Sequence, residues 1–134
     1  MTRLHYWLHA QTQYSINSPF VFEMYREVLF ASLDVETRRR HNIPRGDQFH
    51  EIVYKCCNHY RLQATSRIPN HAHLSSPSSN LSILVVDRPH ATPSAEREWE
   101  RLKGDPDYPV SIDLYDVALL IHNPHLHPQH FLLR

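Results

Sequence analysis

Two side chains that can exchange protons stand at the end of the most apolar stretch of the sequence. Asp87 directly follows the largely aliphatic run Leu81–Val86, and His90 lies in the next turn of chain. Ligands of α/β proteins bind beyond the carboxyl ends of strands, and histidine titrates near neutral pH. Asp87 and His90 are therefore the candidate catalytic residues. The alternative that we favour is a structural role, in which their side chains bond to the backbone at the strand end.

The other side chains that could take part in catalysis or metal binding lie in less favourable settings. The only cysteines, Cys56 and Cys57, are adjacent on a predicted helix, and we expect reduced thiols. Several of the 12 histidines form a tail cluster and a His-x-His pair: His122, His125, His127, His130, His71 and His73. A zinc or nickel site needs converging ligands, and no cysteine or carboxylate accompanies the tail cluster. We therefore expect polar loop histidines and no metal site.

Length and charge restrict the class of protein. The chain has 134 residues, with 14 basic and 14 acidic side chains, which suits one domain with a modest core. A balanced charge creates no field that attracts nucleic acid or an anionic membrane. No stretch approaches the roughly 20 apolar residues of a membrane span, and the start lacks a signal peptide. We expect a cytoplasmic, soluble protein with neither nucleic acid nor membrane as a partner.

The spacing of apolar residues predicts three helices in the first half of the chain. The first, at residues 3–11, is short and amphipathic, with an apolar side made by Leu4, Trp7 and Leu8. The second begins at Ser18-Pro19 and the third after Asp47, because serine and aspartate are good N-caps and proline fits a first turn. Two polar stretches without apolar periodicity are predicted loops: 34–47 and 68–80.

The second half of the chain predicts a small sheet with one flanking helix. A continuous aliphatic run indicates a buried central strand at about 81–87. Residues 110–115 and 117–122 form a predicted hairpin, and 130–133 is a last short strand or a docked tail. Thr92-Pro93 begins a helix over 93–103 that ends at Gly104.

Two motifs in this framework resemble a family of bacterial class I S-adenosylmethionine-dependent methyltransferases that begin with a helical extension. Ser18-Pro19-Phe20-Val21-Phe22 is similar to the signature of that extension, and Val85–His90 resembles the family's fifth strand and the loop after it. The resemblance implies an α/β fold of partial Rossmann-like methyltransferase type, as a single domain over residues 1–134. The helical extension would cover 1–33, and the C-terminal half of the methyltransferase-like domain would cover 81–134.

The sequence departs from that family where the cofactor would bind. Family members place a glycine-rich turn after the first strand, which lets the backbone approach the cofactor, and an acidic residue that holds its ribose. Here no glycine follows a predicted strand, and no acidic residue lies between Glu51 and Asp87. Arg88 also replaces the second acidic residue of the family's loop. We expect no cofactor, with S-adenosylmethionine as the cofactor only of an active enzyme.

These features predict a degenerate or truncated methyltransferase-like protein that is non-catalytic alone and acts through protein association. In the family, the fifth strand lies between the fourth strand and the terminal hairpin. Loss of the fourth strand would leave the edge of 81–87 unpaired, which favours a homo-oligomer or a protein partner there. The alternatives are an active methyltransferase that completes its site through oligomerisation, a small His-rich metal-binding or interaction module, and a shortened gene product without a selected function.

Overall fold

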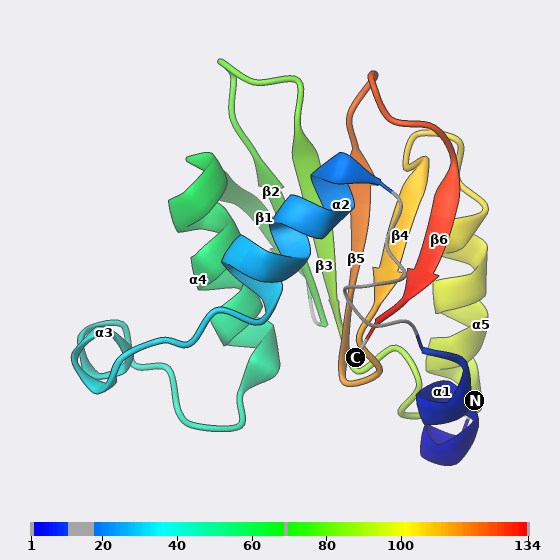
Figure 1. The fold of residues 1–134 in the computed structure, drawn as a ribbon, viewed down its shortest axis with the longest axis horizontal. Coiled ribbons are helices and arrows are strands. Elements are labelled where there is room, and N and C mark those ends of the chain that lie inside the picture. The colour runs from blue at the N-terminus through cyan, green and yellow to red at the C-terminus, as the bar shows by residue number, and fades with distance from the viewer. Residues whose placement is uncertain (1, 11–17, 69, 134) are drawn as a thin grey trace.

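The chain folds into a six-stranded sheet with helices on both faces (Figure 1). The computed structural model describes residues 2–10, 18–68 and 70–133. The helices are α1 (Arg3–His9), α2 (Pro19–Met24), its π-helical continuation η2 (Tyr25–Leu29), α3 (Val35–Arg40), α4 (Gln48–Tyr60) and α5 (Pro93–Lys103). The strands are β1 (Gln63–Ile68), β2 (His71–Ser75), β3 (Ser82–Asp87), β4 (Val110–Asp113), β5 (Val117–His122) and β6 (Gln129–Leu132). The prediction of an α/β protein is confirmed.

The sheet has the strand order β1-β2-β3-β5-β4-β6. Neighbouring strands are antiparallel except β4 and β6, which run parallel. Because β3 and β4 are both antiparallel to β5, they point in the same direction, and β6 points with them. The carboxyl ends of β3, β4 and β6 therefore lie at one end of the sheet.

Helices cover the two faces unequally, and the core is divided accordingly. The larger part of the core lies against α2, η2 and α4, with Met24, Ile52 and Leu119 among its residues. The smaller part contains Trp99 and Leu102 of α5 together with Leu120. Adjacent residues of β5 thus enter opposite parts of the core, since successive strand side chains point to opposite faces. This double burial explains the continuous aliphatic run of β5.

Capping side chains place the helix boundaries near their predicted positions. The side chains of Ser18, Asp47 and Thr92 each accept a backbone N–H from the first turn of α2, α4 and α5. Such a bond satisfies a donor that the helix itself leaves unpaired. Gly104 ends α5, as predicted, whereas α4 ends at Arg61 in the left-handed conformation with φ 56°.

The prediction of a loop over 68–80 is wrong for Ile68, which ends β1, and for residues 71–75. Residues 71–75 form β2, which pairs with β1 on one side and with β3 on the other. In β2 the side chains of Ala72 and Leu74 are fully buried and alternate with half-buried polar residues. Because alanine and histidine are weakly hydrophobic or polar, the alternation of buried and half-buried residues in β2 gives only a weak signal in the sequence. Because β3 has a neighbour on both sides, the predicted unpaired edge at 81–87 is also wrong.

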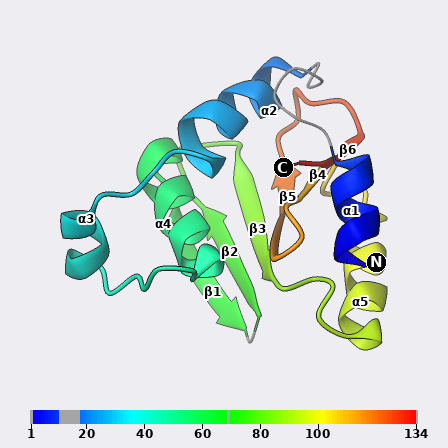
Figure 2. The same cartoon turned by 60° about the horizontal axis from the view of Figure 1, so that its bottom comes forward.

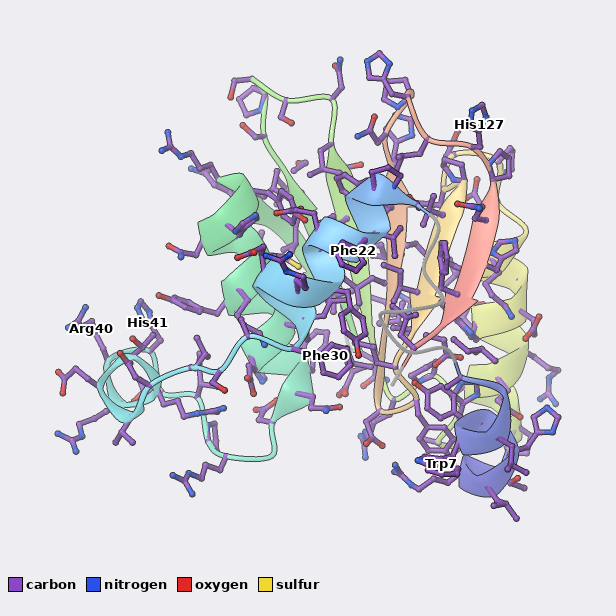
Figure 3. The ribbon with its side chains drawn as sticks, viewed as in Figure 1. Trp7, Phe22, Phe30, Arg40, His41 and His127 are labelled. Carbon is purple, nitrogen blue, oxygen red and sulfur yellow. The ribbon has the colours of Figure 1, made fainter. Side chains whose placement is uncertain are left out.

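In the N-terminal half the predicted first helix is present as α1, and one loop prediction needs correction. The apolar side of α1 faces outward, so that Leu4, Trp7 and Leu8 are 69%, 57% and 63% exposed, whereas Tyr6 is buried. Figure 3 shows Trp7 on this helix at the periphery of the molecule. Within the predicted loop at 34–47, residues 35–40 form α3, capped by Asp34. Among the described residues, no helix has both the length and the apolar character needed to cross a membrane.

Candidate functional site at the carboxyl ends of the strands

The structure does not bring the two predicted catalytic side chains together. The Asp87 carboxylate lies 3.8 Å from the guanidinium of Arg88, and the Asp87 backbone N–H donates to the carbonyl of Asn70 at 2.8 Å. His90 lies in the turn between β3 and α5, and its ring bonds to other carboxylates. The Asp87 side chain thus lies beside Arg88 at the strand end, and its catalytic and structural roles both stay predictions.

His90 is held between two carboxylates that come from different elements. Its Nε2 lies 2.6 Å from Oδ2 of Asp113, at the end of β4, and its Nδ1 lies 2.7 Å from Oε1 of Glu96, in the first turn of α5. The side chains of His90 and Asp113 are each only 3% exposed, whereas that of Glu96 is 31% exposed. One imidazole therefore joins the turn after β3, strand β4 and helix α5.

The surroundings of His90 favour its charged form. Burial by itself lowers the pKa of the imidazole, but the hydrogen bond and charge of Asp113, followed by those of Glu96, outweigh burial and raise the pKa above its ordinary value. In the charged form both ring nitrogens carry protons, and each proton is donated to a carboxylate. A ring in that state has no lone pair with which to remove a proton, so the raised pKa of His90 favours a structural role over a role as general base.

Tyr115 extends this cluster toward the N-terminal helix. Its backbone N–H donates to Oδ1 of Asp113 at 2.8 Å, and its ring stacks on His90 with centroids 5.1 Å apart. The guanidinium carbon of Arg3 lies 4.4 Å from the centroid of the same ring, a cation–π distance. Tyr115 has φ 72°, a backbone conformation that is unfavourable for a residue with a side chain.

Helix α1 covers the carboxyl ends of β4 and β6. The hydroxyl of Tyr6 donates to the carbonyl of Asp113, at 3.0 Å, and is also paired with the carbonyl of Leu133. Arg3 forms an ion pair with Asp116 at 2.8 Å. Figure 2 shows α1 beside β4, β6 and the C-terminal end of the chain. Side chains of α1 thus cover the ends of β4 and β6, whereas cavities lie at the end of β3.

One of the two glycines lies at the strand ends. Gly104 follows α5, whereas Gly46, with φ 85°, lines a cavity of about 470 Å³ together with Asp87, Arg88 and Asp116. The residue that follows β3 is Arg88, with φ 46° and a full side chain. A cavity of about 490 Å³ does lie between the end of β3 and α5, with Arg88, Thr92 and Trp99 among its lining residues. No glycine lines this cavity, and the expectation of no cofactor stays a prediction.

The remaining histidines and cysteines do not form a reaction centre. Within the described ranges, no group of three side chains that could hold a metal ion comes together. His130 Nδ1 lies 2.6 Å from the hydroxyl of Ser111, but Ser111 is 1% exposed and out of reach of a substrate. Cys56 is buried, which raises the pKa of its thiol to about 12 and leaves it protonated at neutral pH.

Sequence reasoning missed the three residues that surround His90. Glu96 lies in the predicted helix over 93–103, where a carboxylate near the N-terminus is favourable. Asp113 and Tyr115 lie in the predicted strand over 110–115. A carboxylate in an otherwise apolar strand is the one signal that indicates Asp113, because a buried charge requires a partner. The identity of that partner depends on the tertiary structure.

Comparison with known proteins gives no further assignment. The chain matches no model of a protein family, no curated protein and no solved structure. The functional argument therefore rests on the sequence motifs and on the geometry of the strand ends.

Proposed function

We propose that the chain is a methyltransferase-like protein that does not transfer methyl groups by itself and acts through protein association. Its motifs resemble the helical extension and the fifth strand of class I methyltransferases. The order β3-β5-β4 supports this ancestry, because the strand that carries the fifth-strand motif lies beside a terminal hairpin. The antiparallel hairpin of β1 and β2 stands where the resemblance would require parallel strands.

The closure of the strand ends is the observation that carries the non-catalytic part of this proposal. Tyr6 and Arg3 of α1 pack onto Tyr115 and Asp116, next to a histidine whose two nitrogens are both engaged. A cofactor at the ends of β4 and β6 would have to displace α1, and the cavities at the end of β3 are lined by Arg88 and other side chains. Both ring nitrogens of His90 bond to carboxylates, so neither nitrogen is open to a substrate in this arrangement.

The experiment that tests this part is calorimetry with S-adenosylmethionine and, separately, with its demethylated product. We expect no heat of binding for either compound up to roughly 1 mM, which corresponds to less than about 4 kcal/mol of binding free energy. The titration is repeated at the highest soluble protein concentration, so that a site completed by oligomerisation would form. Micromolar binding at either concentration would refute the proposal and favour an active methyltransferase.

The association part of the proposal now rests on α1 instead of on a strand edge. Leu4, Trp7 and Leu8 place three large apolar side chains on one exposed side of the helix. A contiguous apolar surface of this kind is typical of protein interaction sites. A homo-oligomer is the first arrangement to test, because it requires no second protein.

Light scattering after size-exclusion chromatography tests this arrangement over a hundredfold range of concentration. We expect a mass that rises with concentration, and a double substitution Leu4→Ser and Leu8→Ser that keeps the protein monomeric. The matched control is Val35→Ser on α3, which changes a side chain that is 59% exposed but lies on another helix. A wild-type protein that stays monomeric at every concentration would contradict self-association through α1.

A further inference from the structure

We propose that His90 is a pH-sensitive latch that holds α1 on the sheet, and that α1 detaches when His90 loses its charge. The inference does not depend on the methyltransferase ancestry, because it rests only on the contacts around the ring. It concerns the chain of contacts from His90 through Asp113 and Tyr115 to the first helix.

The first step is the loss of a hydrogen-bond donor inside a closed site. Charged His90 donates one N–H to Asp113 and the other to Glu96. Neutral imidazole has a single N–H, so one of the two hydrogen bonds is lost, and in either tautomer the ring no longer carries the charge that neutralises the carboxylates. Asp113, which is 3% exposed, then keeps its charge without a cation beside it. Burying a charge without a counter-ion is unfavourable even though Asp113 still accepts the N–H of Tyr115, so the site is expected to rearrange.

The second step carries the rearrangement from Asp113 to the turn between β4 and β5. Asp113 Oδ1 accepts the backbone N–H of Tyr115, which helps to hold that residue at φ 72°. A left-handed conformation costs about 1–2 kcal/mol for a residue with a side chain, so it persists only while its surroundings enforce it. The stacking of Tyr115 on His90 also depends on the position of the ring. Movement of Asp113 and His90 removes both restraints on Tyr115.

The third step is the release of α1, whose Tyr6 and Arg3 side chains are attached to these same residues. Tyr6 contacts the ring of Tyr115 and donates its hydroxyl to the backbone carbonyl of Asp113. Arg3 lies over the Tyr115 ring and pairs with Asp116. The helix has 7 residues, and isolated helices shorter than about 12–15 residues are not stable in water. Once its attachments to the turn loosen, α1 is expected to unfold as it detaches.

The charged groups around the ring determine the direction of the switch. Asp113 faces His90 from β4, Glu96 from α5 and Tyr115 from the turn after β4, while Arg3 of α1 lies beyond Tyr115. Two carboxylates in direct contact outweigh one more distant guanidinium, in line with the raised pKa of His90. A histidine whose pKa is raised by folding stabilises the native contacts below its unfolded pKa. That stabilisation is lost as the pH rises through the folded value, so α1 is docked at acidic to neutral pH and released at alkaline pH.

The fluorescence anisotropy of Trp7 reports the docking of α1. The chain has two tryptophans, and Trp99→Phe leaves Trp7 on α1 as the only one. We expect the anisotropy to fall between pH 6 and pH 9 in a single transition, with a midpoint above the ordinary histidine value. His90→Gln, which cannot be charged, is expected to abolish the transition and give low anisotropy throughout. Hydrogen exchange of the Tyr6 and Ala10 amides, corrected for intrinsic rates, provides a second measurement.

Two further variants keep the test decisive. His50→Gln is the matched control, because His50 also pairs with an aspartate, Asp47 at 2.7 Å, but is 48% exposed and lies on α4. In this variant the pH transition of the Trp7 anisotropy is expected to be the same as in the wild type. If His90→Gln does not fold, Glu96→Gln at a partly exposed position removes one carboxylate and is expected to move the midpoint to lower pH. An α1 that remains docked to pH 9 in the wild type, or a transition unaffected by Glu96→Gln, would overturn the proposal.

Discussion

Replacement of the buried lysine Lys55 by methionine is expected to destabilise the protein by about 2 kcal/mol. The Lys55 ammonium donates to the carbonyls of Leu29, at 3.1 Å, and Ala31, at 2.9 Å, and lies 3.3 Å from Glu51. These carbonyls lie at the end of η2 and just after it, so Lys55 fastens that segment to α4. Methionine preserves the apolar stem of the side chain but donates no hydrogen bond.

The magnitude follows from two opposing effects. A hydrogen bond from a charged group contributes about 1.5–3 kcal/mol, and a buried carbonyl without a donor costs about 1–3 kcal/mol. Against this, methionine removes the cost of burying the ammonium, which is several kcal/mol. That cost is reflected in the pKa of Lys55, which burial lowers even though the charge of Glu51 acts to raise it. Glu51 keeps a partner in the variant, because Arg38 lies 3.0 Å away, so the net loss is expected to stay near 2 kcal/mol.

Urea unfolding followed by circular dichroism measures the effect, with Lys103→Met as the control. Lys103 is the only other lysine, and it pairs with Glu100 at 2.9 Å on the surface of α5. Such exposed pairs contribute about 0–1 kcal/mol, so the control is expected to unfold close to the wild type with the same m-value. Equal stability of Lys55→Met and Lys103→Met would refute the reasoning that Lys55 anchors η2.

Three further predictions test the hairpin, the thiols and the second part of the core. Leu74→Ala is expected to cost about 3 kcal/mol and His73→Ala less than about 1 kcal/mol, by urea unfolding; equal small losses would mean that β2 is not in the core. A thiol reagent at pH 8 is expected to label Cys57 alone, and Cys56 only after unfolding, because burial raises the pKa of Cys56 to about 12; mass spectrometry of the labelled peptide decides this. Trp99→Phe is expected to change stability by less than about 1.5 kcal/mol, since the buried indole N–H has no hydrogen-bond partner among the described residues and its removal offsets the lost volume. A loss above about 3 kcal/mol would contradict that balance.

Local sequence signals predicted most of the elements because the physical cause of each lies within a few residues. Thr92, Pro93 and Gly104 define α5, since an N-cap, a first-turn proline and a helix-ending glycine act on their immediate neighbours. The run of β5 identified a strand because burial on both faces requires apolar residues at every position. The pairing of β4 with β5 followed from the short turn between them.

Longer-range features were predicted poorly, and the first half of the sheet is the clearest case. The segment His71–Ser75 contains one leucine among small or polar residues, so its sequence does not show which face is buried. The packing of β3 and α4 around it defines that face. The orientation of α1 could not be predicted from the sequence either, because three outward apolar residues outnumber the buried Tyr6. The hydroxyl of Tyr6 reaches carbonyls more than a hundred residues away in the chain, and no local pattern encodes such a contact.

The candidate site shows the same division. The sequence by itself determined that a histidine and an aspartate follow the central strand, and that no glycine turn is present to receive a cofactor. Only the tertiary structure decided what His90 does, because Asp113 and Glu96 meet it from β4 and α5. The pKa of a side chain depends on the charges and solvent around it, and these are set by elements that are distant in sequence. His90 is therefore a candidate base in the sequence, and in the folded protein its ring is buried between two carboxylates that favour its charged form.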